Sequence, residues 1–172
     1  MANFGEILSN ISVPAGQAVR RNAGNTAFEA YTPASGGSFV GCLATRTTNQ
    51  NIGTTYTAMT FPSEVWDTDT MHSTSLDTEK IEINTAGKYA IFGAVEIPEI
   101  DNVPVYIRML KNGSSVLGIT QFQRANLASN IQGGVPAYAF ADLVDTDYVT
   151  MEIKSIAGTT NYQGFLSVYK IG

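Results

Sequence analysis

The stretch DLVDTDYVTMEIKSIAG at residues 142–158 is followed, after a short gap, by NYQGFLSVYKIG at residues 161–172. Both stretches are rich in β-branched and aromatic residues, which favour β-strands. The second stretch runs to Gly172, and a terminus that ends on a strand is usually held in a sheet. We therefore expect two neighbouring strands of one sheet here, within an all-β fold.

Short strand-like runs also recur through residues 39–172, at intervals of roughly 10 to 15 residues, and no segment shows the 3.6-residue period of a core helix. Asn112-Gly113 is a strong hairpin signal, because type I′ turns need positive φ at both central positions. A second turn is predicted at 84–87, where Gly87 adopts positive φ at little cost. These runs predict about eight strands.

Residues 1–38 differ from the rest of the chain. They hold three turn-forming clusters, VPAG, NAGN and TPASGG, so no long element is expected there. The alternating stretches GQAVRRN and TAFEAYT predict two small paired strands, and residues 35–38 predict a flexible joint. We therefore divide the chain into an N-terminal attachment arm and hinge, residues 1–38, and a head domain, residues 39–172.

The arm has too few apolar residues for a core of its own. Such a terminal segment is either disordered or docked on another protein, and docking fits an anchor. The residues predicted to make this anchoring contact are Phe4, Ile7, Leu8, Ile11 and Val13.

Composition excludes several classes of protein. The 172 residues are enough for a core without disulfides, and the single cysteine, Cys42, is expected to be buried and inert. The net charge of −5, with no basic cluster larger than Arg20-Arg21, argues against nucleic acid as a partner. The sequence has neither a signal-peptide pattern nor an apolar stretch long enough to span a membrane, so we expect no secretion by the general route and no membrane insertion.

Several strands of the head are apolar on both faces. In residues 137–144, Tyr138 and Phe140 alternate with small alanines. Residues 162–171 are likewise apolar at both parities. A two-layer sandwich covers only one face of each sheet, so the second apolar face needs another subunit. The side chains predicted to line this contact between copies are Tyr138, Phe140, Tyr162, Phe165 and Tyr169.

Three short motifs follow one another in the head: GKY at 87–89, LVDTD at 143–147 and YQGFL at 162–166. They resemble the Gly-x-Tyr, Leu-x-x-x-Asp and Phe-x-Gly-Phe-Leu motifs of the complement globular heads and the tumour necrosis factor superfamily, with Tyr162 in place of Phe. The resemblance covers residues 39–172. It implies an antiparallel jelly-roll sandwich of about eight to ten strands that assembles as a homotrimer.

The context differs from that of the secreted animal members, because the sequence has no collagen repeat and no cysteine pair. The arm and the stretch at 61–91 resemble bacteriophage structural proteins instead. This resemblance implies a virion protein, made in the host cytoplasm and displayed on the particle as a capsid decoration or head-fibre protein. Its partners would be its own copies and, through the arm, the major capsid protein or another virion protein.

Two alternatives stay open. One is the receptor-binding tip of a tail fibre, whose loops, such as residues 67–78 and 123–135, attach to a host-surface glycan. The other is a jelly-roll carbohydrate-active enzyme, which needs paired carboxylates; the nearest candidates are Glu96, Glu99 and Asp101. We predict a binding protein and not an enzyme.

The sequence offers little for catalysis or metal binding. His72, the only histidine, lies in a polar stretch and is expected to be a surface loop residue. Asp67, Asp69 and Asp77 are oxygen ligands of the kind calcium prefers, but their spacing is not that of a dedicated calcium loop, and Asx turns explain them as well. We therefore predict no catalytic, cofactor-binding or metal-binding residue.

Overall fold

The computed structural model describes residues 18–21, 28–31, 39–97, 104–123, 133–156 and 160–172. The chain divides into two compact units, residues 1–38 and residues 39–172. In the first unit, β1 (Ala18–Arg21) pairs antiparallel with β2 (Phe28–Tyr31), as the two alternating stretches predict. The anchoring residues predicted from the sequence lie outside the described residues: Phe4, Ile7, Leu8, Ile11 and Val13.

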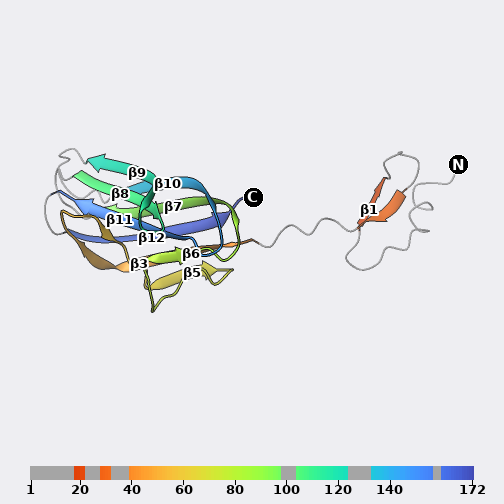
Figure 1. The fold of residues 1–172 in the computed structure, drawn as a ribbon, viewed down its shortest axis with the longest axis horizontal. Coiled ribbons are helices and arrows are strands. Elements are labelled where there is room, and N and C mark those ends of the chain that lie inside the picture. The colour runs from red at the N-terminus through yellow and green to blue at the C-terminus, as the bar shows by residue number, and fades with distance from the viewer. Residues whose placement is uncertain (1–17, 22–27, 32–38, 98–103, 124–132, 157–159) are drawn as a thin grey trace. The chain divides into compact units, whose positions relative to one another are not determined.

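The second unit, the head, has ten strands in two antiparallel sheets, and its described residues contain no helix (Figure 1). The first sheet has five strands, in the order β10 (Gly133–Leu143), β7 (Gly87–Ile97), β12 (Thr160–Lys170), β3 (Gly41–Ile52) and β5 (Ser63–Asp67). The second sheet has the order β4 (Thr57–Ala58), β11 (Tyr148–Ser155), β8 (Pro104–Lys111) and β9 (Ser115–Gln123), with β6 (Lys80–Glu82) also paired to β11. This is the antiparallel jelly-roll sandwich that the sequence predicts.

The two C-terminal stretches do form strands, β11 and β12, but in different sheets. β11 pairs with β8, whereas β12 lies between β7 and β3. The prediction that they share one sheet is wrong, because composition and alternation identify a strand without naming its partner. The end of the chain is held as expected, since the Lys88 N–H donates to the Gly172 carbonyl at 2.8 Å.

The two predicted turns have different roles. Asn112 and Gly113 have φ of 52° and 67° and close the hairpin of β8 and β9, which confirms the Asn-Gly signal. Residues 84–87 instead join β6 to β7, which lie in different sheets, and Gly87 does not adopt positive φ. Glycine is required there for space, because a Cβ would lie 2.6 Å from the carbonyl oxygen of Gly172.

The core fills the space between the two sheets. Its largest fully buried side chains include Tyr89, Tyr162, Phe61, Ile52, Met59, Met71, Ile81, Ile83, Ile91, Ile107 and Met109. Cys42 is buried among them, as predicted. Burial raises the pKa of its thiol to about 12, and the charges of Asp67 and Glu64 add to the effect, so the thiol stays protonated.

A buried carboxylate joins the β8–β9 hairpin to the turn before β11. Asp147 accepts hydrogen bonds from the Val144 N–H and from Asn112 Nδ2, both at 2.8 Å, and Lys111 Nζ lies 2.6 Å from its Oδ2. Burial acts to raise the pKa of Asp147, but the hydrogen bonds from Lys111, Val144 and Asn112 outweigh it, and the net pKa lies below the ordinary value of 3.8. The ionised form therefore stabilises the fold.

Acidification is expected to weaken this junction. Because the folded pKa is the lower one, the stabilisation by Asp147 is complete above the unfolded pKa near 3.8 and is lost as the pH falls through the folded value. Asp147→Asn should lower the free energy of unfolding at pH 7 by roughly 1–3 kcal/mol and flatten its decline between pH 5 and 2, measured by urea unfolding. The control is Asp142→Asn, whose exposed carboxylate lies 3.9 Å from Lys88. Equal losses in both variants would contradict the prediction.

Candidate binding surface on the five-stranded sheet

The outer face of the five-stranded sheet can be traced from strand register, because directly opposed residues point to the same side. One row across the sheet runs through Tyr138, Phe92, Ser167, Leu43 and Trp66. A neighbouring row runs through Phe140, Ala90, Tyr169 and Gly41, and a third through Pro136, Ala94, Phe165 and Thr45. On β3, β7, β10 and β12, the opposite parity supplies the buried core residues.

The aromatic side chains of these rows, together with Phe39, form an aromatic face that the described residues of the head leave largely exposed. Its exposed members are Tyr138 (66%), Phe140 (64%), Phe39 (54%), Phe165 (38%) and Phe92 (36%). Tyr169 and Trp66 are half-buried beside them. We call these seven residues the aromatic face.

Five of the seven rings contact one another in an unbroken series. Phe39 meets Trp66 edge-on at a centroid distance of 5.1 Å and lies 6.2 Å from Tyr169. Tyr169 stacks on Phe92 at 5.8 Å, and Phe92 meets Phe140 edge-on at 6.3 Å. Contacts at these distances hold aromatic side chains in a defined arrangement, so the aromatic face is organised before any partner arrives.

In the middle of strand β10, the aromatic residues point outward and only alanines point inward. Ala137 and Ala139 point into the core and are buried, while Tyr138 and Phe140 point away from it. The cause is the close approach of β9: a Cβ on Gly118 would lie 2.7 Å from the Tyr138 carbonyl oxygen and 3.4 Å from Ala139 Cβ. Beside Gly118 there is room only for small side chains in the core, so the aromatic residues of β10 face outward.

Four of the five residues predicted to line a contact between copies lie together on this face, namely Tyr138, Phe140, Phe165 and Tyr169. Tyr162 does not, since it is 1% exposed and belongs to the core. It has the parity of Leu166 and Val168, which also point inward. Alternation along β12 already separated Tyr162 from Phe165, so its inclusion in the contact was an error of parity.

Three members of the aromatic face were not predicted: Phe39, Phe92 and Trp66. Phe92 was recognisable as opposite in parity to buried Ile91, but its neighbours depend on the pairing of β7 with β10 and β12. Phe39 and Trp66 join the face through β3 and β5, whose pairing contains an irregularity between Leu43 and Ala44. Single-sequence alternation does not reveal such long-range pairing.

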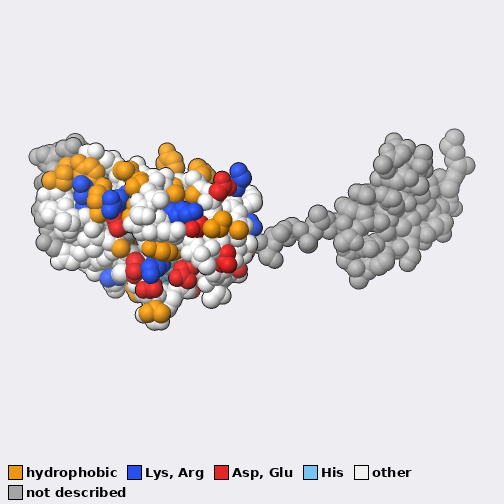
Figure 2. All heavy atoms as spheres, viewed as in Figure 1, with side chains coloured by type: hydrophobic (Ala, Val, Ile, Leu, Met, Phe, Trp, Pro, Cys, Tyr) orange, Lys and Arg blue, Asp and Glu red, His pale blue; other side chains and the backbone are white. Residues whose placement is uncertain are grey.

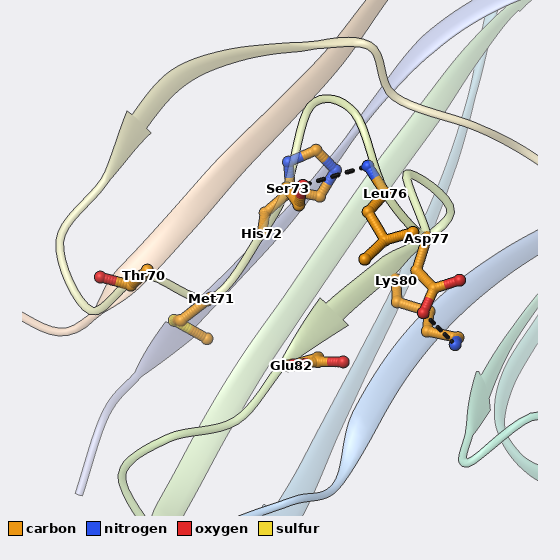
Figure 3. Close-up of a pocket in the computed structure, with 8 residues that line it drawn as sticks. All are labelled: Thr70, Met71, His72, Ser73, Leu76, Asp77, Lys80 and Glu82. Atoms are coloured by element: carbon orange, nitrogen blue, oxygen red, sulfur yellow. Dashed lines mark hydrogen bonds and ion pairs between the residues drawn. The ribbon is translucent and has the colours of Figure 1, made fainter.

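The polar loop at 67–78 and β6 enclose a cavity of about 190 Å³ (Figure 3). His72 lines it but is buried, which corrects the prediction of a surface residue. Its Nδ1 lies 3.0 Å from Glu64 Oε1 and its Nε2 lies 3.2 Å from the Thr78 carbonyl oxygen. Both ring nitrogens are thus engaged in holding the loop, a structural role for His72.

The side chains of two of the three aspartates of this loop, Asp67 and Asp77, have separate partners, while Asp69 Oδ2 is buried without a hydrogen bond to any described residue. Asp67 accepts hydrogen bonds from the backbone N–H groups of Asp69 at 3.1 Å and His72 at 2.9 Å, an arrangement that stabilises the loop as an Asx turn does. Asp77 pairs with Lys80 at 2.9 Å on the wall of the cavity (Figure 3). Across the described ranges, no three His, Cys, Asp or Glu side chains come together as a metal site would require.

A second cavity, of about 380 Å³, borders the aromatic face at Phe165. Glu96 and Gln163 line it, and Gln163 Nε2 donates to Asn49 Oδ1 at 3.0 Å. Of the carboxylates considered for glycoside hydrolysis, Glu96 is the one placed here, while Glu99 and Asp101 lie outside the described residues. The described lining therefore contains one carboxylate and not the pair that hydrolysis uses.

The fold has counterparts among solved structures. The globular domain of zebrafish complement 1qA protein matches with a TM-score of 0.56 and 16% sequence identity, over 77% of this chain and 98% of that chain. The structure of Eiger TNF from S. frugiperda matches with a TM-score of 0.47 and 8% identity, over 78% of this chain and 93% of that one. The first comparison establishes that the head has a complement globular-head-like jelly-roll fold.

No protein-family model matches the chain, and no curated protein matches it in sequence. Within the described part of the chain, no helix is long and apolar enough to cross a membrane.

Proposed function

We propose that this chain is a structural binding protein, not an enzyme, whose head self-associates as a homotrimer through the aromatic face. The observation that carries the proposal is the series of contacting aromatic rings, exposed or half-buried, on one side of the sandwich. Monomeric proteins seldom leave a contiguous apolar patch of this kind in water. Threefold assembly is supported by the resemblance of the sequence motifs to a trimeric family.

The energetics favour association. Removing a large aromatic side chain from water stabilises the assembly by about 1.5–3 kcal/mol, before the costs of association and side-chain ordering are subtracted. The rings already contact one another in the single chain, so little additional ordering is required at Tyr169 and Phe92. Tyr138 and Phe140, the most exposed rings of the face, would contribute most.

We further propose that the head is displayed on a bacteriophage particle, as a capsid decoration or head-fibre protein anchored by residues 1–38. The support is the resemblance of the arm and of residues 61–91 to phage structural proteins. Three arms held together by one trimer would bind with a high effective concentration, so each arm needs only modest affinity.

Two measurements test this function. Light scattering of the purified full chain should give a mass of about 55 kDa, three times the 18.4 kDa of one chain. Mixed with undecorated phage capsids, the protein should co-sediment with them, while a variant with Phe4, Ile7 and Leu8 changed to Ser should remain trimeric in the supernatant. A monomeric mass would overturn the trimer, and sedimentation unaffected by the arm changes would overturn the anchor.

A further inference from the structure

The outer face of the other sheet carries a cluster of tyrosines and cations. Tyr106 and Arg108 occupy alternate positions on β8, and Lys154 and Glu152 on β11 lie directly opposite them. Tyr56, just before β4, completes the group. We call these five residues the tyrosine–cation cluster. Figure 2 shows Lys and Arg side chains interleaved with apolar ones over this part of the head.

The two cations of the cluster differ in their electrostatic state. Arg108 stacks on Tyr56, with its Cζ 3.9 Å from the ring centroid, and Glu152 binds its guanidinium at 2.5 Å. Lys154 Nζ lies 4.7 Å from the Tyr56 centroid and 4.6 Å from the Tyr106 centroid. Among the described residues, no carboxylate lies within ion-pair distance of Lys154. Its ammonium is therefore held between two rings, with no carboxylate of the described residues to neutralise its charge.

This cluster is independent of the aromatic face. The two groups of residues lie on the outer faces of different sheets. If the trimer forms as proposed, the aromatic face becomes buried while the tyrosine–cation cluster stays accessible. The cluster is thus a surface left free for a partner other than a second copy.

We infer that the tyrosine–cation cluster binds a carboxylated sugar of an acidic glycan. The charge complementarity lies in Lys154, whose ammonium can donate charge-assisted hydrogen bonds to a carboxylate. Tyr56 and Tyr106 supply rigid surfaces for the apolar side of a sugar ring, as aromatic residues do in binding sites.

The number of unpaired cations in the cluster and the presence of two ring surfaces favour an acidic sugar over other anions. Binding to nucleic acid depends on neutralising several phosphates at once, and one unpaired cation on a chain of net charge −5 cannot supply that. An acidic peptide would use the charge of Lys154 but would gain little from the ring surfaces. A sugar uses both features, so it is the occupant that the cluster fits.

The full chain should be titrated calorimetrically at low salt with trigalacturonate, and with maltotriose as the neutral sugar of equal length. We expect trigalacturonate to bind at least about tenfold more tightly than maltotriose. Lys154→Gln should weaken the binding of trigalacturonate at least about fivefold. The matched control Lys88→Gln removes the same charge from an exposed site on the other sheet and should change affinity less than about twofold.

A second variant separates sugar stacking from charge alone. Tyr56→Leu keeps the net charge and an apolar side chain but removes a ring, and it should weaken the binding of trigalacturonate at least about threefold. Equal affinity for trigalacturonate and maltotriose would overturn the inference, as would equal losses in Lys154→Gln and Lys88→Gln. A hexaglutamate peptide that binds as tightly as trigalacturonate would also overturn it, in favour of a docking site for acidic protein. Retained sugar binding by a monomeric protein would support the inference while refuting the trimer.

Discussion

Replacing Tyr138 and Phe140 together by Ser is expected to convert the proposed trimer into folded monomers. Both side chains are about two-thirds exposed in the single chain, so their loss removes almost no contact from the core of the head. Each ring removed from the proposed contact weakens association by about 1.5–3 kcal/mol, because its apolar burial is lost. The trimer contains three copies of each ring, so this loss occurs three times for each ring. Light scattering should therefore report 18.4 kDa in place of about three times that mass.

The matched control for this variant is Ile119→Ser. Ile119 is 62% exposed, close to Tyr138 and Phe140, but it projects from β9 in the other sheet. This variant should stay trimeric, and circular dichroism should show that both variants keep the β-sheet spectrum of the unchanged protein. A double variant that remains trimeric, or an Ile119→Ser variant that dissociates, would refute the aromatic face as the contact.

A single added methyl group at Gly164 is expected to destabilise the head strongly. A Cβ there would lie 2.3 Å from the Ala94 carbonyl oxygen and 3.2 Å from Val95 Cα, and both of these atoms belong to the backbone of β7. The neighbouring strand has to shift to make room, because no side chain can simply rotate away. Gly164→Ala should lower the free energy of unfolding in urea by roughly 1–3 kcal/mol or more.

Gly134→Ala provides the comparison within the same sheet. A Cβ at Gly134 would meet no atom within 4 Å, and the residue is exposed on β10. Its replacement should leave stability unchanged or raise it by up to about 1 kcal/mol, since alanine restricts the unfolded chain. If the two variants unfold at the same urea concentration, the tight contact between β12 and β7 is not the reason that glycine occupies position 164.

Much of the surface that we propose for self-association could be predicted before the structure. Alternation placed Tyr138 and Phe140 opposite alanines, and Phe165 opposite Leu166, so the existence of a second apolar face followed from period-two geometry. Sequence reasoning did not show that Phe39 and Trp66 extend this face. Those two residues reach it through the pairing of β3 with β5, which contains a register irregularity.

The tyrosine–cation cluster could not be predicted in the same way. Tyr56 and Lys154 are nearly a hundred positions apart in sequence, and they meet because β4 and β8 flank β11. Dependence on distant neighbours also explains the wrong prediction for His72. Its polar neighbours in sequence suggested a surface loop, but its ring is buried and is held by hydrogen bonds with Glu64 and the Thr78 carbonyl. Local composition describes the neighbours in sequence and not the neighbours in space.

By itself the sequence determined that this chain forms an all-β head, where most of its strands and its Asn112-Gly113 hairpin lie, and that one apolar face is left over; it predicted about eight strands, and the described residues of the head form ten. Only the tertiary structure decided which strands share a sheet, separating β11 from β12 and turning Tyr162 into the core. The physical reason is that strand formation depends on local sterics, and that the face of the sheet toward which each side chain points depends on period-two alternation. The choice of partner strand depends instead on packing between residues far apart in the chain, which no local pattern records.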